Sequence, residues 1–310
     1  MRTVRRKKQI QKTRRHKKSR RQRHQRQQGG SSSANCSPKP ISDRKSGDSK
    51  SCYSMDDLVR LKDVWNKRNP SNLIHSKTQT ELVAELTNKF SKTCPNEHCW
   101  YKQFAEVHEL QGMNSLFAPD APAVWKTNPN EWLSSNDIIA VMKQYSKIYK
   151  CFEFLGPAPI DFDKVISGSC VENNLCNINI KKLMDAGKFK IGISLNTDPH
   201  NKGGEHWISM FINIKKGFIF FFDSAGVKAP KQVVALSDRI IKQGLELTPP
   251  IHFKFDQNYP KQHQYTTTEC GMYSLYFIVS MLEDKLTQQY LKTHIITDKY
   301  IQKLRKVYYN

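Results

Sequence analysis

The chain has 310 residues, of which 50 are Lys or Arg and 28 are Asp or Glu, giving a formal net charge of +22. The charge is uneven, because residues 1–53 carry +16 of it and residues 54–310 carry only +6. Hydrophobic residues make up 38% of the chain and are concentrated after residue 53, which excludes a wholly disordered protein.

The sequence also argues against a membrane span or a secretory signal. Its most apolar uncharged run, Gly271 to Leu282, is much shorter than the roughly 20 residues of a spanning helix. No apolar stretch follows the basic N-terminal segment. We therefore expect a reducing compartment, cytosolic or nuclear, or a particle assembled there, and free thiols at the eight cysteines.

The N-terminal segment 1–28 contains 14 basic residues and no acidic residue. Such a run is predicted to be a disordered polycation that binds nucleic acid by counterion release. A nuclear-import signal and a solubilising tail are the alternatives. Gly29-Gly30 and the following Ser and Pro residues extend it as a linker, so that residues 1–53 are predicted as a disordered polybasic arm and linker.

Three helices are predicted before the first strand. Ser54 and Asp57 have the spacing of a capping box, and Asn69-Pro70 ends the helix that they begin. Further amphipathic helices are predicted over residues 80–90 and 135–149, the latter with its cap at Ser135 to Asp137.

A short cysteine cluster lies between these helices, where Cys94, His98 and Cys99 fall within six residues. A structural zinc site needs four ligands, and no second pair lies nearby in the sequence. We therefore expect a turn with free thiols here, with a zinc site or a Cys94–Cys99 disulfide as the alternatives.

The periodicity changes to that of strands after residue 188. Strands are predicted over 189–195, 206–214, 217–222 and 251–255, and Lys215-Lys216 is the expected turn of a hairpin. Helices are predicted over 230–243, after Cys270, and over 298–308. This order predicts an α+β fold with a central, mostly antiparallel sheet flanked by helices.

Polar residues stand at the ends of these elements. His206 opens one strand and Asp223 ends its hairpin partner, so antiparallel pairing brings them to the same end of the sheet. An aspartate there would accept a hydrogen bond from the imidazole and stabilise its charged form.

Cys270 begins an apolar helix, whose N-terminal positive charge favours a thiolate. Gly271 leaves room for a substrate backbone. The backbone amide of Cys270 and the side-chain amide of Gln264, six residues upstream, are candidate donors to an oxyanion.

Together with their neighbours, these residues resemble the cysteine proteases of the adenovirus protease and ubiquitin-like-protein (SUMO) protease type. The resemblance covers residues 130 to 282 and rests on Gly204-Glu-His-Trp207, Phe221-Phe-Asp-Ser224, and Gln264 followed by Glu269-Cys270-Gly271. Trp132-Leu133-Ser-Ser-Asn136-Asp137 is similar to a Trp-Leu-Asn-Asp segment of the family, with two extra residues. Glu269 stands where the cellular enzymes have Asp. The segment before residue 130 resembles proteases of large cytoplasmic DNA viruses.

The resemblance implies a papain-like catalytic domain over residues 131–310, preceded by an N-terminal helical region over 54–130. It implies that Cys270 is the nucleophile, His206 the general base, Asp223 the orienting carboxylate and Gln264 an oxyanion donor, with Trp207 and Gly271 at the substrate. It implies no cofactor and no metal, and a monomer is expected.

The function expected from this resemblance is cleavage of viral structural polyproteins during virion maturation, after Gly-Gly-type sites. The expected location is the virion and the host cytoplasm, with the nucleus open through the polybasic arm. Three alternatives remain: a SUMO or ubiquitin-like deconjugating protease, a Cys/His acetyltransferase, and an inactive DNA-binding protein.

Overall fold

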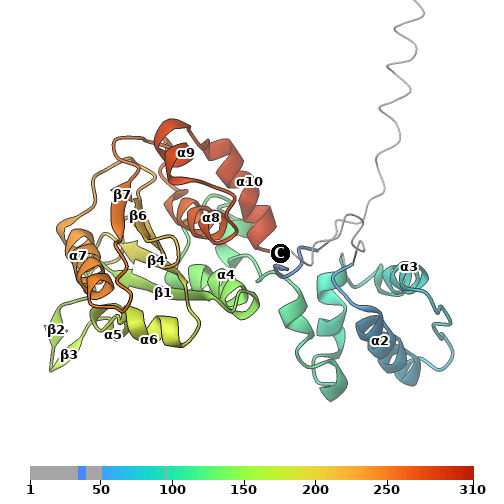
Figure 1. The fold of residues 1–310 in the computed structure, drawn as a ribbon. Coiled ribbons are helices and arrows are strands. Elements are labelled where there is room, and N and C mark those ends of the chain that lie inside the picture. Colours follow the sequence, from blue (N-terminus) through green and yellow to red (C-terminus); the bar gives the residue numbers. More distant parts are fainter. Residues whose placement is uncertain (1–33, 40–50, 95) are drawn as a thin grey trace, which may run out of the picture. The chain divides into compact units, whose positions relative to one another are not determined.

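The computed structural model describes residues 34–39, 51–94 and 96–310, and the chain divides into two compact units (Figure 1). Of the described residues, the smaller contains residues 34, 53–94 and 96–111, and the larger contains residues 35–39, 51–52 and 112–310. The predicted boundary at residue 130 lies inside the larger unit, where Trp125 packs edge-on against Tyr309. The predicted polybasic run 1–28 lies outside the described residues.

The smaller unit is built on two helices that pack against each other, α2 (Met55–Arg68) and α3 (Gln79–Phe90). Capping boxes begin both helices, formed by Ser54 with Asp57 and by Thr78 with Glu81. Three 3-10 turns follow, η2 (Glu97–Cys99), η3 (Tyr101–Phe104) and η4 (His108–Leu110). The two helices predicted in this part of the chain are confirmed.

Five strands form the central sheet of the larger unit, in the order β1-β4-β5-β6-β7, and β2 and β3 form a separate small hairpin. The central strands β4, β5 and β6 are antiparallel, whereas the edge strands β1 and β7 pair in parallel. The bounds are β1 Phe152–Pro159, β2 Val165–Ile166, β3 Ser169–Cys170, β4 Lys190–Asn196, β5 Trp207–Asn213, β6 Phe218–Phe222 and β7 Lys254–Gln257.

Helices cover both faces of this sheet (Figure 1), which confirms the predicted α+β class with an antiparallel centre. Helices α4, α8 and α10 lie on one face, and α5, α6 and α7 on the other. The bounds are α4 Ser135–Ile148, α5 Asn173–Cys176, α6 Ile180–Asp185, α7 Lys231–Leu245, α8 Cys270–Leu282, α9 Gln288–Thr293 and α10 Asp298–Tyr308, with 3-10 turns η5 Met113–Leu116 and η6 Ala123–Lys126.

Several elements differ from the sequence prediction, and the short elements β2, β3, α5, α6 and α9 have no counterpart in it. Strand β1 was not predicted, because Gly156, Pro157 and Pro159 are poor strand formers and the register shifts between Leu155 and Ala158. Proline is tolerated here because β1 is an edge strand. Strand β7 begins at Lys254, three residues after its predicted start. Helix α4 starts at Ser135 as predicted, with Ser134 as its cap.

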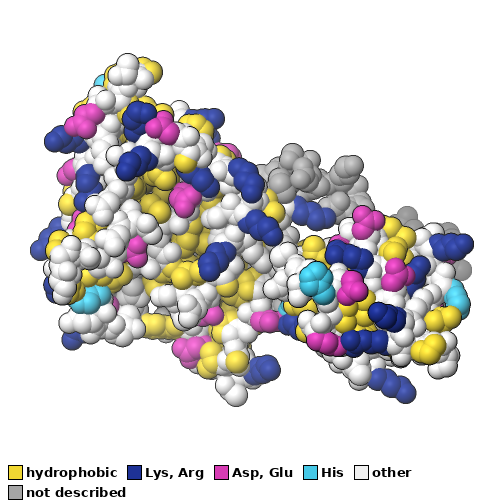
Figure 2. Space-filling view, turned by 90° about the horizontal axis from the view of Figure 1, so that it is seen from below, with side chains coloured by type: hydrophobic (Ala, Val, Ile, Leu, Met, Phe, Trp, Pro, Cys, Tyr) yellow, Lys and Arg dark blue, Asp and Glu magenta, His cyan; other side chains and the backbone are white. Residues whose placement is uncertain are grey.

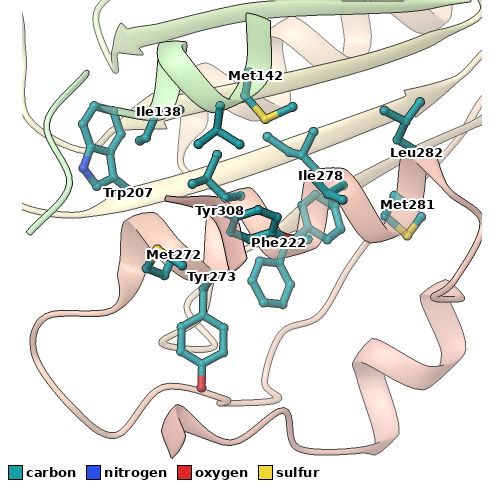
Figure 3. Packing of buried hydrophobic residues seen from close by; sticks show 14 of the residues in the cluster. Ile138, Met142, Trp207, Phe222, Met272, Tyr273, Ile278, Met281, Leu282 and Tyr308 are labelled. Atoms are coloured by element: carbon teal, nitrogen blue, oxygen red, sulfur yellow. The ribbon is translucent and has the colours of Figure 1, made fainter. Parts of the chain in front are cut away.

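Alternating residues of β5 divide between two apolar cores, as a strand buried on both faces requires. Trp207 and Phe211 join the core beneath α8, whereas Ile208 and Met210 join the core beneath α7. Figure 3 shows part of the first core, which includes Ile138 and Met142 of α4, Phe222 of β6 and Ile278 of α8.

Helix α8 lies close to the sheet, and this placement positions its first residue, Cys270. A Cβ on Gly192 of β4 would lie 2.6 Å from Cγ2 of Ile278, so only glycine allows this approach. One strand over, Ser209 donates a hydrogen bond to Ser274 at 2.9 Å between buried hydroxyls. Ser274 lies one helical turn after Cys270, and the nucleophile end of α8 is therefore held against β5.

Six of the eight cysteines form disulfides, which corrects the expectation of free thiols. The bonds are Cys36–Cys52, Cys94–Cys99 and Cys170–Cys176, whose Cα atoms are 5.2, 5.6 and 6.3 Å apart. The second and third pairs are close in sequence, and the Cα separations of all three lie within the usual disulfide range. Cys94 and Cys99 bind each other instead of zinc. Cys151 and Cys270 are free thiols.

Part of the predicted linker, residues 34–39, has defined contacts in the larger unit. Asn35 donates through its backbone to the side chain of Asn310 at 2.7 Å and accepts from the same side chain at 3.0 Å. Cys36 forms an isolated bridge with Phe117. The described part of this linker is therefore attached to the C-terminal end of the catalytic unit.

The surface of the larger unit carries mixed charge. On the face seen in Figure 2, Lys and Arg side chains are interspersed with Asp and Glu and do not gather in one patch. Within the described ranges, no helix is both long and apolar enough to cross a membrane.

Candidate active site

The end of the β5–β6 hairpin opposite its turn brings His206 and Asp223 together. Ser209 pairs with Phe222 in this hairpin, so the residue before β5 lies beside the residue after β6. The distance from Nε2 of His206 to Oδ1 of Asp223 is 2.7 Å. The structure thus places the predicted histidine and carboxylate in direct contact.

The position of Asp223 is set by its backbone as well as by its carboxylate. Asn258, which is fully buried, accepts from the backbone N–H of Asp223 at 2.9 Å and donates to its carbonyl at 2.7 Å. Oδ1 of Asp223 also accepts from the backbone N–H of Ala225 at 2.8 Å. At the end of β6, the side-chain amide of Asn258 therefore makes the two backbone hydrogen bonds that a residue of a neighbouring strand would make.

Cys270 is the first residue of α8 and is buried. Its thiol is close enough to the His206 imidazole to act on the pKa of that ring, whose Nε2 contacts Asp223. Burial on its own lowers the pKa of His206, but the hydrogen bonds with Asp223 and Cys270 outweigh it and raise the pKa to about 10. A positively charged imidazole and a helix N-terminus both favour a thiolate.

Gln264 is oriented by Ser224, the residue after the aspartate. The Ser224 hydroxyl donates to Oε1 of Gln264 at 2.7 Å, and the Ser224 carbonyl accepts from the backbone N–H of Gln264 at 2.8 Å. Nε2 of Gln264 donates to the carbonyl of Thr266 at 2.6 Å. The buried amide thus has a fixed orientation beside the Asp223 strand end.

Trp207 and Gly271 pack together against Leu133. The indole N–H of Trp207 donates to the Leu133 carbonyl at 2.9 Å. A Cβ on Gly271 would lie 2.9 Å from Cβ of Leu133 and 3.3 Å from Cδ1 of Trp207. The prediction that Gly271 leaves room for substrate is therefore corrected, because Leu133 and Trp207 fill that space.

Trp207 also lines a cleft of about 620 Å³. Its lining includes the apolar residues Trp132, Leu133, Pro157, Ala158 and Pro159, and residues of the β4–β5 loop such as His200, Lys202, Gly203 and Gly204. Neither Cys270 nor His206 lines the cleft, but Trp207 follows His206 in the chain and packs near Gly271, which follows Cys270. The cleft is therefore a candidate binding site for a substrate peptide.

Sequence reasoning missed two of the residues that build this site, Asn258 and Arg305. Arg305 of α10 forms a buried ion pair with Glu269, the residue before Cys270, at 3.0 Å. Asn258 lies in a polar loop and Arg305 in a helix rich in Lys, and nothing in their local sequence distinguishes them. Their partners are 35 and 36 residues away.

This arrangement is suited to nucleophilic chemistry by a thiol. A cysteine at a helix N-terminus, an imidazole that bonds a carboxylate and whose pKa the thiol raises, and a backbone N–H at the nucleophile are the parts of acyl transfer through a thioester. An adjoining cleft supplies a place for the acyl donor.

Comparison with known proteins agrees with this chemistry. The model of the Ulp1 protease family, C-terminal catalytic domain, matches residues 192–310. A protein of Acanthamoeba polyphaga mimivirus named as a thiol protease is 30% identical over 269 residues, covering 80% of this chain and 84% of that protein. A protein of African swine fever virus named as a SUMO-1 cysteine protease is 32% identical over 260 residues, covering 76% and 90%.

A solved structure shares the fold over nearly the whole chain. The crystal structure of the African swine fever virus protease aligns with a TM-score of 0.62 at 19% identity, covering 91% of this chain and 97% of that chain. The likeness therefore extends beyond the catalytic unit.

Proposed function

Because this chain belongs to the Ulp1 protease family and is a cysteine-type peptidase, we propose that Cys270 is its nucleophile, with His206 as the base and Asp223 as the orienting carboxylate. The observation that carries the proposal is the 2.7 Å bond between His206 and Asp223, with the Cys270 thiol as the second partner of the imidazole. These are the contacts that acyl transfer through a thiolate requires.

In the proposed reaction, the Cys270 proton resides on His206, and the thiolate attacks the scissile carbonyl carbon. The carbonyl oxygen becomes an oxyanion that accepts from the Cys270 backbone N–H and from Nε2 of Gln264. His206 then gives its proton to the leaving amine as the C–N bond breaks. A water molecule deprotonated by His206 hydrolyses the thioester and returns the proton to the cysteine–histidine pair.

The substrate that we propose is a viral structural polyprotein, cleaved after a Gly-Gly-type site during virion maturation. The relatives named as proteases are proteins of large DNA viruses, and Trp207, which packs near the residue after the nucleophile, lines the cleft. Residues without side chains suit an approach to the thiol past this bulky indole. The enzyme would act in the virion and the host cytoplasm.

The test is incubation of purified full-length protein with candidate virion polyproteins. We expect cleavage by the wild type, none by Cys270→Ala, and wild-type cleavage by Cys151→Ala, because Cys151 is the second free thiol and lies outside the site. N-terminal sequencing of the products gives the cleavage position. Cleavage by Cys270→Ala would refute the assigned nucleophile, and products that do not begin after Gly would refute the assigned specificity.

A second candidate, removal of SUMO or ubiquitin-like proteins, is favoured by the relatives named as SUMO-1 cysteine proteases. It predicts that a SUMO or ubiquitin vinyl-sulfone probe labels Cys270 covalently. A polyprotein processing enzyme without deconjugating activity would leave the probe unreacted.

For the arm we propose nonspecific binding to nucleic acid, carried by the 14 basic residues of segment 1–28. The affinity for a mixed-sequence DNA duplex should fall steeply with salt, by a log–log slope of about −0.9 for each phosphate neutralised. Replacing the arm's Lys and Arg by Gln should remove most of this slope, and Cys270→Ala should leave it unchanged. Equal binding by the Gln variant would refute the proposal.

A further inference from the structure

We propose that Arg305, in the last helix of the chain, is a positioning residue for the nucleophile and for the wall of the substrate cleft. The inference rests on the proposed role of Cys270. Arg305 is 5% exposed and lies 35 residues after Cys270 in the chain. Its contacts reach three segments that meet at the active site.

The guanidinium uses its donors in three directions. Nε and the NH2 group bind Oε2 of Glu269 at 3.0 Å. NH1 donates to the Glu131 carbonyl at 2.8 Å, and NH2 reaches the Thr268 carbonyl at 3.3 Å. The guanidinium lies over the Trp125 ring, with Cζ 4.4 Å from its centroid. A planar group with five N–H donors can make this set of contacts, and a lysine ammonium cannot.

The contact with Glu269 acts on the nucleophile itself. The peptide between Glu269 and Cys270 carries the N–H that is the proposed oxyanion donor. The carboxylate of Glu269 is fully buried, and its backbone carbonyl accepts from the N–H of Tyr273 at 2.8 Å as the first bond of α8. With both its side chain and its carbonyl held, Glu269 fixes the plane of that peptide and the direction of the Cys270 N–H.

The contacts with residues 130 and 131 act on the cleft wall. NH2 of Arg305 also reaches the Asn130 carbonyl at 3.4 Å, and Trp132 and Leu133 follow directly. Leu133 accepts from the Trp207 indole and packs on Gly271. A single side chain therefore sets the distance between the residue before the thiol and the segment that lines the cleft.

Helix α10 has the rigidity that this role needs. The side chain of Ile301 in α10 is fully buried. The hydroxyl of Tyr309, which follows the last residue of α10, donates to the Asp137 carbonyl at 3.0 Å. The side chain of Asn35 donates to the carbonyls of Lys306 and Tyr309. At the other end of α10, Oδ1 of Asp298 accepts from the Tyr273 hydroxyl of α8 at 3.0 Å, so both ends of the helix are attached to neighbouring segments.

A positioning role explains why a charged pair is buried here. Replacement of a buried ion pair by well-packed apolar residues is often neutral or stabilising, so such a pair is weak support for stability alone. Correct placement of an oxyanion donor is worth roughly 10²- to 10³-fold in kcat. The placement of the oxyanion donor therefore depends on the planar arrangement of the guanidinium N–H groups of Arg305 more than on their charge.

The experiment compares Arg305→Lys, Glu269→Gln and the double variant Arg305→Met/Glu269→Met with wild type, on a peptide that wild type cleaves and Cys270→Ala does not. We expect Arg305→Lys to lower kcat about 10- to 100-fold with KM changed less than about twofold. Glu269→Gln keeps one acceptor oxygen for the guanidinium, and its kcat should fall less than that of Arg305→Lys. The double variant removes both charges and should keep the wild-type melting temperature within a few degrees while kcat remains low.

Two further readouts separate positioning from a structural role. Alkylation of Cys270 by iodoacetamide needs the thiolate but no oxyanion donor, so its rate should be unchanged in Arg305→Lys. The matched control is Arg239→Lys on α7, which loses similar contacts with Asp163 and the Leu175 carbonyl away from the site and should keep wild-type kcat. A kcat within twofold of wild type in Arg305→Lys, or recovery of kcat in the double variant, would overturn the inference. Failure of wild type to cleave any peptide would instead count against the proposed function.

Discussion

His206 and His263 both lie beside the end of β6, yet the structure holds them in opposite protonation states. His206 contacts Asp223 and Cys270, and its pKa is raised to about 10. His263 is fully buried, donates from Nε2 to the Leu291 carbonyl at 3.0 Å and accepts at Nδ1 from the Ile296 N–H at 3.2 Å. Burial lowers its pKa to about 4, and the bond with Leu291 offsets only part of this effect.

The difference shows that the partners of a buried imidazole can outweigh the effect of burial on its charge. Burial acts on both rings in the same direction. A carboxylate beside His206 reverses that effect, whereas His263 has one neutral acceptor and one neutral donor, which together fit only the uncharged ring. The first region, around His206, is thus suited to proton transfer. The second region, around His263, holds the loop that carries Gln264.

The largest effect is expected from Asp223→Asn, which removes the carboxylate from the first region. An amide partner no longer favours the imidazolium and stabilises the wrong ring tautomer, so kcat should fall about 10²- to 10⁴-fold. The pKa of His206 should fall, and the alkaline limb of Cys270 alkylation should move to lower pH. The measurement is the rate of alkylation between pH 5 and about 11.

Asp284→Asn is the matched control, because Asp284 is a paired carboxylate near the turn end of the same hairpin, bonded to Lys190 and Lys216. It should keep the wild-type alkylation profile. An unshifted profile in Asp223→Asn would mean that the carboxylate does not set the charge of His206.

The second region predicts a loss of stability in acid. The folded pKa of His263, about 4, is below its unfolded value of about 6.5, so its contribution is fully present above pH 6.5 and is lost as pH falls towards 4. The loss is about 3 kcal/mol. Urea unfolding of His263→Gln, which keeps a donor for Leu291, should show less acid dependence than wild type.

His206 has the opposite sign and provides an internal check. Its folded pKa exceeds its unfolded value, so its contribution is fully present below pH 6.5 and is lost as pH rises through about 10. Wild type should therefore lose stability in both acid and alkali. Asp223→Asn should show less loss of stability in alkali than wild type, and His263→Gln should show less loss in acid. Equal pH dependence in all three proteins would contradict the comparison.

Asn258 joins the two regions, since it belongs to the loop that leads to His263 and binds the backbone of Asp223. Asn258→Ala leaves a buried N–H and a buried carbonyl without this partner, and should cost about 2 kcal/mol of unfolding free energy. The pKa of His206 should fall partway towards that in Asp223→Asn, as seen in the alkylation profile. A stability loss without any shift in this profile would show that Asn258 does not position the carboxylate.

Local sequence patterns predicted the parts of this site that follow from nearby residues. The hairpin register predicted the approach of His206 to Asp223, the apolar run after Cys270 predicted a thiol at a helix N-terminus, and the short spacing to Cys270 indicated Gln264 as an oxyanion donor. Patterns did not reveal the roles of Asn258, His263 and Arg305, because each is defined by partners 28 or more residues away. The disulfides could not be predicted for the same reason. The expected cellular compartment and the sequence spacing of the cysteines do not determine which cysteines the fold brings together.

The smallest effect is expected from Tyr273→Phe, which tests whether the second region is structural only. The Tyr273 hydroxyl lies 3.0 Å from the His263 carbonyl, 2.7 Å from that of Ile296 and 3.0 Å from Oδ1 of Asp298. Its removal should cost about 1 kcal/mol of unfolding free energy and leave kcat within about twofold of wild type, measured by urea unfolding and peptide cleavage. A tenfold fall in kcat at unchanged stability would instead mean that this loop acts on the reaction through Gln264, and that both histidine regions belong to the catalytic apparatus.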